Sequence, residues 1–464
     1  MGFASIRPRS RWEPYRVIGT LLFLGAGLIP LALLGSAGTQ GLIAVAVAAV
    51  LYILIFIHIH LGLGLLVVCF GLSPEFEIAG ISNFRIEDLF IPVVILAWAT
   101  RLSMRRESLE PTDLKVPILC LIGLSAISTL LNVAWWDLPL LKSILFFGKT
   151  VEYYLIFLVV MNVVKTREQV VAYAVLLIAV SLAGGLFGLH QYLTEGLGIA
   201  GAKVTGPVGE TANIFGGYLA FHMLLAAGMA ISIPGIWARI ILGAYLFVNM
   251  FPLLYTFSRT TFASFVGGLL ALGMLRRGRA LFGVVLFLVL LPFLFPEQVS
   301  QRFGTILSIF SDNPPPSWSA RLGAWQKFGG AVRESPLIGR GVASIPAGFI
   351  DNEYIKQAHE LGLAGLIVLF WLLFRIFRTA LYTIDRVDDR RLLGFCTGFA
   401  AGFAAILIHN LGATSLTSIR IAEPFFFATG LLYAVRNHML PDGDAKTEME
   451  PRDEQAGDPA LDMT

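Results

Sequence analysis

Long apolar runs without charges recur along almost the whole of this 464-residue chain. A run of about 20 apolar residues is enough for a helix to cross the hydrocarbon core of a bilayer. Hydrocarbon offers the backbone no hydrogen-bond partners, so a chain with many such runs folds as helices that satisfy their own amides and carbonyls. The sequence therefore predicts an all-α fold, a polytopic bundle of transmembrane helices.

The apolar runs predict 12–14 spans, because several of the fourteen candidates are short. Only 14% of the residues are charged, whereas about a quarter are charged in a soluble protein. The stretch 40–72 could instead form a broken or re-entrant segment. The candidates lie near 17–35, 40–56, 58–72, 88–101, 117–132, 141–161, 170–190, 213–232, 239–257, 260–275, 281–296, 360–382, 391–410 and 421–437.

Basic residues predict the topology of these spans. If the N-terminus lies inside the cell, alternate counting leaves the short outside loops 36–39 and 133–140 without any Lys or Arg. This is the positive-inside pattern, and it predicts that both termini are cytoplasmic. The arginines before the run 17–35 also fit a signal sequence, but the run is long for one, so we predict a retained first span. The inside loops receive Arg101, Arg105, Arg106, Lys115, Lys165, Arg167, Arg276, Arg277, Arg279, Arg386, Arg390 and Arg391.

We expect one membrane domain over residues 1–437 and a disordered acidic tail over 438–464. A loop of about sixty residues, 297–358, falls outside and contains the proline run 314–316 followed by a predicted short helix. Loops of this length are usually functional. The net charge of +3 is too small to indicate nucleic acid. The cysteines and histidines show no spacing typical of metal ligands, so we predict neither a metal nor a cofactor.

Basic residues at the outer ends of spans are not explained by topology. Arg259 is the sharpest case, because it stands between two apolar runs with almost no loop. An arginine fixed at the membrane edge by two helices is expected to have an anionic partner; the alternative is a side chain that extends to lipid headgroups. The whole set is Arg85, Lys203, Arg259, Arg302, Arg321, Lys327, Arg333, Arg340, Lys356 and Arg420.

Arg321 lies on the apolar face of the predicted loop helix. At about 100° per residue, Trp325 and Phe328 share its side of the wheel, which leaves the guanidinium on the buried face. A charge there needs a partner or a ligand, and an internal salt bridge is the alternative to a substrate role. Arg340 lies between two glycines, which suit either a ligand or an ordinary turn.

Three further positions have a structural alternative to a functional role. Arg420 could pair with Glu423 on one helix face. Lys149 and Glu152, at i,i+3 within the span 141–161, are expected to neutralise each other. Asp351 precedes a span, where a carboxylate can cap the helix, or it could act in catalysis.

Several of these segments occur in an order that resembles the O-antigen ligase and O-antigen polymerase family of bacterial membrane glycosyltransferases. They are Lys203-Val204-Thr205-Gly206-Pro207 followed by Asn213, Ser258-Arg259, the segment 321–341, and Asp351-Asn352-Glu353-Tyr354 followed by 360–365. The resemblance covers roughly residues 75–437. Family ligases typically carry histidine before the asparagine, whereas this chain has Asp351, which is more similar to polysaccharide polymerases.

The resemblance implies metal-independent, inverting glycosyl transfer at the periplasmic face of the inner membrane, with 297–358 as the periplasmic loop. The donor would be a glycan on undecaprenyl pyrophosphate, and the acceptor a glycan or a lipid. Other polysaccharide assembly proteins are further possible partners. Arginines bind phosphate bidentately and stay charged, so Arg259 and Arg321 are predicted to stabilise the leaving pyrophosphate. Asp351 is the predicted general base; the predicted substrate-binding set also includes Lys203, Arg340, Asn352, Tyr354, Arg420 and His359, the last as a fallback base.

Two other functions remain open from the sequence. A ligase of the same family would transfer the glycan to lipid A-core. A transporter or lipid-carrier flippase would place buried charges near mid-membrane in several spans, where the sequence shows only Lys149 and Glu152.

Overall fold

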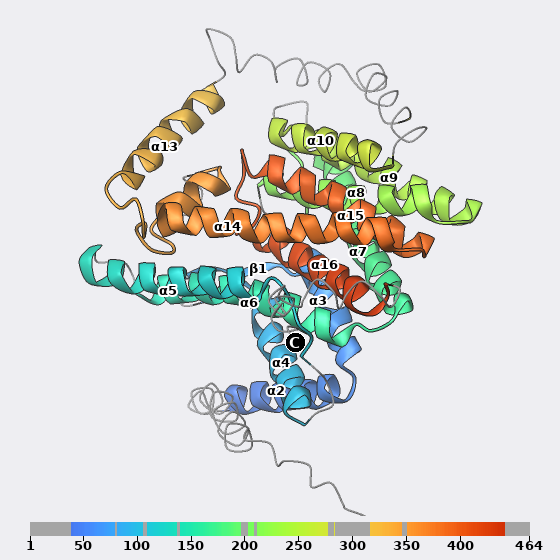
Figure 1. The fold of residues 1–464 in the computed structure, drawn as a ribbon, viewed down its shortest axis with the longest axis horizontal. Coiled ribbons are helices and arrows are strands. Elements are labelled where there is room, and N and C mark those ends of the chain that lie inside the picture. The colour runs from blue at the N-terminus through green and yellow to red at the C-terminus, as the bar shows by residue number, and fades with distance from the viewer. Residues whose placement is uncertain are drawn as a thin grey trace, which may run out of the picture.

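The computed structural model describes residues 39–78, 81–104, 109–136, 140–195, 203–207, 211–276, 283, 316–345 and 350–440. These residues form a bundle of helices (Figure 1), which confirms the all-α prediction. The helices are α2 (Thr39–Ile57), α3 (Ile59–Leu72), α4 (Ile86–Ser103), α5 (Lys115–Trp136), α6 (Leu140–Val163), α7 (Arg167–Glu195), α8 (Ala212–Ser232), α9 (Ile236–Tyr255), α10 (Arg259–Arg276), α13 (Pro316–Val332), α14 (Glu353–Arg386), α15 (Arg390–His409) and α16 (Ile419–His438).

Each predicted span that falls within the described residues coincides with one of these helices. Among them, seven are long and apolar enough to cross a membrane, or eight if one bent pair counts as a single span. That pair is α2 and α3, which meet at His58 with a bend of 118°. The broken segment predicted within 40–72 is therefore present. The predicted spans 17–35 and 281–296, Gly283 apart, lie outside the described residues, as does the tail beyond 440.

Helices α8 and α15 form the centre of the bundle. In the most apolar stretch of α8 83% of the residues are buried, and in that of α15 78% are buried. In α9 the corresponding share is only 22%. The two central helices approach closely at Gly228, where an added Cβ would meet the backbone of Gly398. Small residues of this kind let membrane helices pack backbone to backbone, where van der Waals contact replaces the hydrophobic effect.

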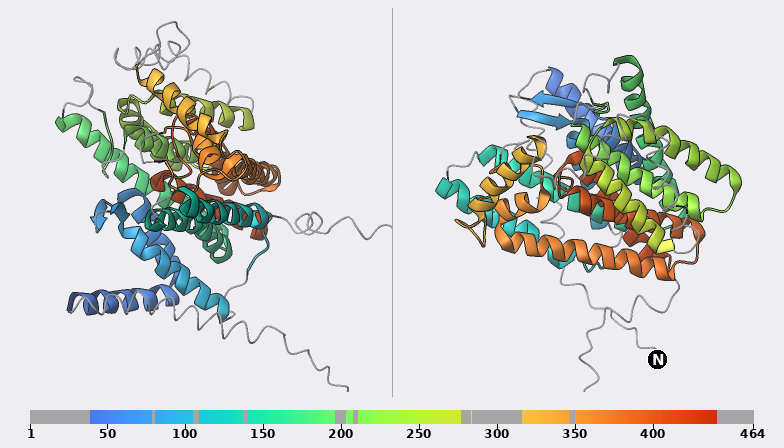
Figure 2. Two further views of the ribbon diagram at one scale, coloured as in Figure 1. Left: turned by 90° about the vertical axis from the view of Figure 1, so that its left-hand side faces the viewer. Right: turned by 90° about the horizontal axis from the view of Figure 1, so that it is seen from above.

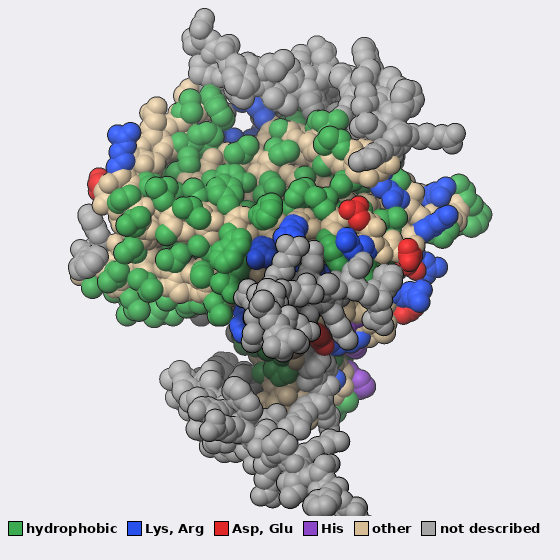
Figure 3. Space-filling model, in the orientation of Figure 1, with side chains coloured by type: hydrophobic (Ala, Val, Ile, Leu, Met, Phe, Trp, Pro, Cys, Tyr) green, Lys and Arg blue, Asp and Glu red, His purple; other side chains and the backbone are tan. Residues whose placement is uncertain are grey.

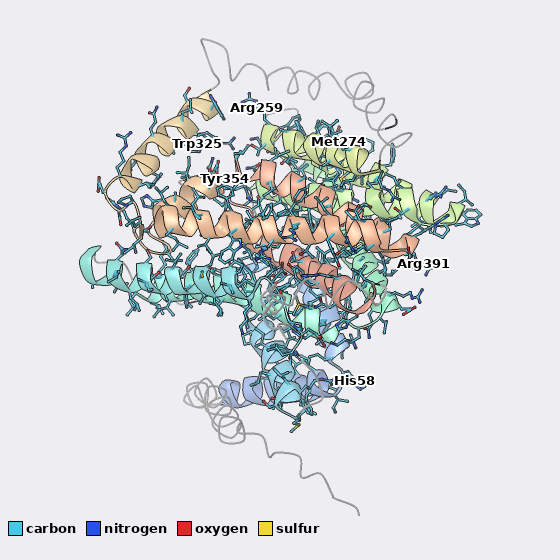
Figure 4. All side chains as sticks on the ribbon, in the orientation of Figure 1. His58, Arg259, Met274, Trp325, Tyr354 and Arg391 are labelled. Carbon is cyan, nitrogen blue, oxygen red and sulfur yellow. The ribbon has the colours of Figure 1, made fainter. Side chains whose placement is uncertain are left out.

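The two ends of the bundle differ in charge. In the space-filling view apolar side chains cover a broad area, and many of the visible basic and acidic side chains gather toward the end that carries Arg391 (Figures 3 and 4). Arg259, Trp325 and Tyr354 lie toward the opposite end (Figure 4). The side views show α13 as a separate arm over that opposite end (Figure 2).

A two-stranded hairpin interrupts the helices between α3 and α4, and the sequence did not predict it. Strand β1 (Glu75–Ile78) pairs antiparallel with β2 (Ile81–Arg85), with an irregularity between Phe76 and Ile78. Strand β1 alternates polar and apolar residues over only four positions, and β2 does not alternate strictly, so periodicity does not identify either strand.

Helix α14 is broken at Gly362 near its N-terminal end. Gly362 has φ 70° and ψ −174°, a combination that is essentially confined to glycine. The loop before α14 packs against this break, because Leu363 N donates to the Pro336 carbonyl at 2.8 Å and Arg340 N donates to the His359 carbonyl at 2.8 Å. The first turns of α14 therefore form a unit set off from the long apolar helix that follows.

Candidate active site

A cavity of about 510 Å³ lies where the turn between α9 and α10 meets α13 and the start of α14. Four of the residues singled out in the sequence, Lys203, Arg259, Arg321 and Asp351, line it together. They come from four segments that are far apart along the chain. Its complete described lining is Lys203, Thr205, Thr211, Ala212, Asn213, Thr256, Phe257, Ser258, Arg259, Arg321 and Asp351.

The turn that presents Arg259 is tight and locally strained. Phe257 adopts φ 47°, a left-handed conformation that costs a bulky residue energy. Thr256 stabilises the turn, because its Oγ1 donates to the Leu253 carbonyl at 2.7 Å and accepts from Ser258 N at 3.3 Å. Arg259 is the first residue of α10. The turn thus places Arg259 in the lining of the cavity.

Asn213, near the start of α8, fixes the position of this turn. Ser258 Oγ donates to Asn213 Oδ1 at 2.6 Å, and Asn213 Nδ2 donates to the Gly412 carbonyl at 2.7 Å. One side chain therefore joins the α9–α10 turn to the α15–α16 turn. This role of Asn213 could not be predicted from the motif that contains it, because Ser258 and Gly412 are both far from Asn213 in the sequence.

The segment that carries Lys203 is anchored to α7 and α9. Val204 N donates to the Tyr255 carbonyl at 3.1 Å, and Gln191 Oε1 accepts from Thr205 N at 3.2 Å and Gly206 N at 3.1 Å. These contacts keep Lys203 in the lining of the cavity.

Arg321 and Asp351 form an ion pair in the lining of the same cavity. Arg321 Nε and Nη2 both lie 3.3 Å from Asp351 Oδ2, and Nη1 lies 3.4 Å from Thr260 Oγ1. The side chains are 27% and 49% exposed, so the pair stays within reach of a ligand. The internal salt bridge considered as an alternative is present, and it lies in the cavity.

Asn352, and not Asp351, caps α14. Asn352 Oδ1 accepts from Ile355 N at 3.0 Å, and its Nδ2 donates to the Leu411 carbonyl at 3.1 Å. Asn352 is only 5% exposed, and both the oxygen and the nitrogen of its side-chain amide are bonded to the backbone. These contacts give Asn352 a structural role as the cap of α14. Asp351 is left outside the cap, with its carboxylate in the cavity.

The other predicted binding residues do not lie in the described lining of this cavity. Arg340 pairs with Glu334, and Tyr354 donates its hydroxyl to the Leu407 carbonyl at 2.8 Å. His359 is buried and has Nδ1 3.2 Å from the Phe328 carbonyl.

Arg420, which the sequence placed outside, is fully buried in α16. Its guanidinium lies 5.4 Å from the ring centroid of Tyr218. Nothing in its position brings it to the cavity, so its predicted substrate role stays a prediction.

Lys149 and Glu152 pair as the sequence predicted, at 2.9 Å, but they are not alone. Lys149 also pairs with Asp88 and lies 3.4 Å from Glu423, which is fully buried. The cluster joins α4, α6 and α16 within the bundle. Mutual pairing of buried charges of opposite sign is what a structural role requires.

The cavity suits a ligand with more than one negative charge. Its described lining contains three basic side chains and one carboxylate, with hydroxyl groups of Thr205, Thr211 and Ser258 between them. Among the residues that the structure describes, no group of three or more His, Cys, Asp or Glu could hold a metal ion. Basic side chains in such a cavity can neutralise the charge of a bound anion.

The comparisons with known proteins agree with this geometry. Residues 244–370 match the family model described as O-antigen ligase. The match begins in α9 and ends in α14, so it includes Arg259, Arg321 and Asp351. The search of curated proteins finds no match to the chain. The resemblance expected from the sequence is thus confirmed over residues 244–370, which are similar to the O-antigen ligase family model.

Proposed function

We propose that this O-antigen ligase-type membrane glycosyltransferase moves a glycan from undecaprenyl pyrophosphate to an acceptor hydroxyl at the periplasmic face of the inner membrane. The observation that carries the proposal is the convergence of Lys203, Arg259 and Arg321 on one cavity that also contains Asp351. A pyrophosphate has the charge and the several oxygens that such a set recognises.

In the proposed reaction, the acceptor oxygen forms a bond to the anomeric carbon while the bond from that carbon to the pyrophosphate oxygen breaks. The electron pair of the broken bond stays on the pyrophosphate, and the proton of the acceptor hydroxyl passes to Asp351. Attack from the side opposite the leaving group inverts the anomeric configuration. Arg259 and Lys203 stabilise the charge that develops on the leaving oxygen.

Arg321 has two roles in this proposal. Arg321 orients the Asp351 carboxylate through two hydrogen bonds to one of its oxygens. When a pyrophosphate enters the cavity, the five N–H groups of the guanidinium allow Arg321 to contact both anions. The ion pair then loosens, and Asp351 becomes able to accept the proton.

Asp351 favours a polymerase that joins repeat units of an O-antigen or exopolysaccharide over a ligase that transfers to lipid A-core. Family ligases typically have histidine at this position, and the nearest histidine along α14, His359, lies against Phe328. The ligase remains the second candidate, because the family description of residues 244–370 names that activity.

Transport is less well supported. The buried charges around Lys149 pair with one another within one cluster, and a carrier needs charged groups that can exchange partners along a path.

Deletion of the gene, followed by gel analysis of surface polysaccharide, tests the proposal. A polymerase predicts that long chains disappear while single repeat units still reach lipid A. A ligase predicts that full chains accumulate on the lipid carrier. Normal polysaccharide together with lost uptake of a solute would refute both.

A further inference from the structure

We infer that Glu353 is a positioning residue, whose buried carboxyl group attaches Asp351 and Asn352 to the turn 410–418 and so sets where Asp351 lies in the cavity. The inference rests on the proposed function, in which Asp351 is the base.

Glu353 is bonded to this turn through both its backbone and its side chain. Its side chain is 1% exposed, and Oε2 accepts from Leu416 N at 3.2 Å and from Thr417 Oγ1 at 3.3 Å. Its backbone N–H is shared between the carbonyls of Asn410 at 3.0 Å and Ala413 at 3.1 Å. Four contacts from one residue fix the chain two positions after Asp351.

The same turn is also connected, through Asn213, to the segment that carries Arg259. The Gly412 carbonyl accepts from Asn213 Nδ2 at 2.7 Å, and Asn213 in turn accepts from Ser258 at 2.6 Å. Turn 410–418 is therefore hydrogen-bonded to the segment that carries Asp351 and, through Asn213, to the segment that carries Arg259. Loss of the Glu353 side-chain contacts weakens only the Asp351 side, where the backbone N–H of Glu353 and Asn352 Nδ2 still bond to the turn.

Turn 410–418 is itself held in place by hydrogen bonds. Asn410 Oδ1 accepts from Ser415 N at 3.0 Å, and His409 Nδ1 lies 2.7 Å from Ser415 Oγ. Tyr153 of α6 donates to the Thr417 carbonyl at 3.3 Å. All of these contacts come from buried or half-buried groups.

A carboxyl group suits this position because two donors converge on one of its oxygens. A buried N–H left without an acceptor is unfavourable, so removal of the carboxyl group weakens the attachment of the first residues of α14 to this turn. Glutamine keeps an oxygen in that place, whereas alanine does not. An acid in the first turn also interacts favourably with the helix dipole, but that interaction requires neither Leu416 nor Thr417.

The test compares Glu353→Ala and Glu353→Gln in the full-length chain. Two quantities are measured: the initial rate of polysaccharide formation per protein molecule in host membranes, and the stoichiometry and affinity of geranylgeranyl pyrophosphate binding in nanodiscs. We expect Glu353→Ala to lower the rate about 10- to 100-fold, because small displacements of a catalytic group have effects of this size. Binding stoichiometry should stay at the wild-type value, and Glu353→Gln should stay within about threefold of the wild-type rate.

Glu360→Ala is the matched control. Glu360 is also a buried carboxyl group of α14, but it accepts from Ala343 N at 3.1 Å and does not contact the turn in any described hydrogen bond. We expect a rate per bound site within about threefold of the wild type. A Glu360→Ala loss as large as that of Glu353→Ala would assign both residues to general folding and overturn the inference.

Two further outcomes separate the inference from the proposed function. Wild-type turnover in Glu353→Ala, with Asp351→Asn inactive, overturns the inference alone. Wild-type turnover in Asp351→Asn refutes the proposed base. Proportional loss of binding and turnover in Glu353→Ala also overturns the inference, because it shows unfolding and not displacement.

Discussion

Arg321 and Asp351, thirty residues apart in the sequence, meet through a single oxygen: Nε and Nη2 of the guanidinium both lie 3.3 Å from Asp351 Oδ2. Arg321 belongs to α13 and Asp351 precedes α14, so this contact ties the arm formed by α13 to the bundle. The third nitrogen of Arg321 reaches Thr260 of α10 at 3.4 Å. One side chain thus links three segments at the cavity.

Replacement of Arg321 by lysine tests whether this geometry matters beyond charge. Lysine keeps the positive charge but lacks the planar set of N–H groups with which Arg321 contacts Asp351 and Thr260 together. We expect Arg321→Lys to lose transfer activity about tenfold or more, and Arg321→Ala to lose about 10²-fold or more. Incorporation of labelled repeat units into polymer measures the rate. Lys327, an exposed cation on the same helix, provides the control, and Lys327→Ala should match the wild type. Equal activity of Arg321→Lys and the wild type would contradict a role for the guanidinium geometry.

Arg259→Ala should abolish transfer without affecting membrane insertion. Arg259 opens α10 at the edge of the cavity, so its removal takes one cation from the predicted pyrophosphate site and leaves the apolar span intact. We expect a loss of about 10²-fold or more in rate, measured together with the amount of protein in the membrane fraction. Arg239→Ala, an exposed arginine on α9, serves as the comparison. Full activity of Arg259→Ala would remove this residue from the mechanism.

The spans were predictable because the cost of charge in hydrocarbon acts on each run separately. The break at His58 was also visible, since the stretch 40–72 is interrupted by polar residues. The face of Arg321 followed from helix periodicity alone. Phe328 is buried on that same face, as the wheel predicted.

The contacts between distant segments were not predictable. Asn352 looked like a substrate ligand, yet it caps α14 and reaches Leu411. The burial of Arg420 within the bundle was likewise not visible in the polar residues that precede it along the chain. The importance of Asn213 and Glu353 depends on the turn 410–418, and no local pattern specifies which segments a turn will meet in the folded chain.

Gly362 should tolerate no side chain. Its φ and ψ fall in a region where other residues lose about 1–3 kcal/mol, and an added Cβ would also collide with the Leu337 carbonyl. We expect Gly362→Ala to lower the thermal stability of the purified protein and its yield. Gly123, in the middle of α5, has open space around the position of a Cβ, so Gly123→Ala should be neutral or slightly stabilising. Equal melting temperatures for the two variants would show that the break in α14 is not required.

Lys149 should matter for stability more than for chemistry. Replacement by methionine leaves Asp88, Glu152 and Glu423 without their shared cation. Removal of one partner of a buried ion pair is destabilising by about 3–5 kcal/mol. Lys149→Met should therefore reduce the yield of folded protein, while the rate per folded molecule stays near the wild type; Lys142→Met, on the same helix, should change neither. A normal yield with a large loss of rate per molecule would give Lys149 a direct role in function.

The proposed chemistry requires the cavity to face the periplasm, and cysteine labelling tests this directly. Cys69, Cys120 and Cys396 are free thiols, so the reporters are introduced into a variant that lacks them. Ser319, exposed on α13, should react with a membrane-impermeant maleimide in intact spheroplasts when replaced by cysteine. Arg390, exposed at the start of α15 next to Arg391, which lies near the opposite end of the bundle (Figure 4), should react as cysteine only after permeabilisation. The positive-inside distribution of arginine predicts this order. Labelling of Ser319→Cys only after permeabilisation would place the cavity on the cytoplasmic side, where a lipid-linked glycan already moved across the membrane could not reach it.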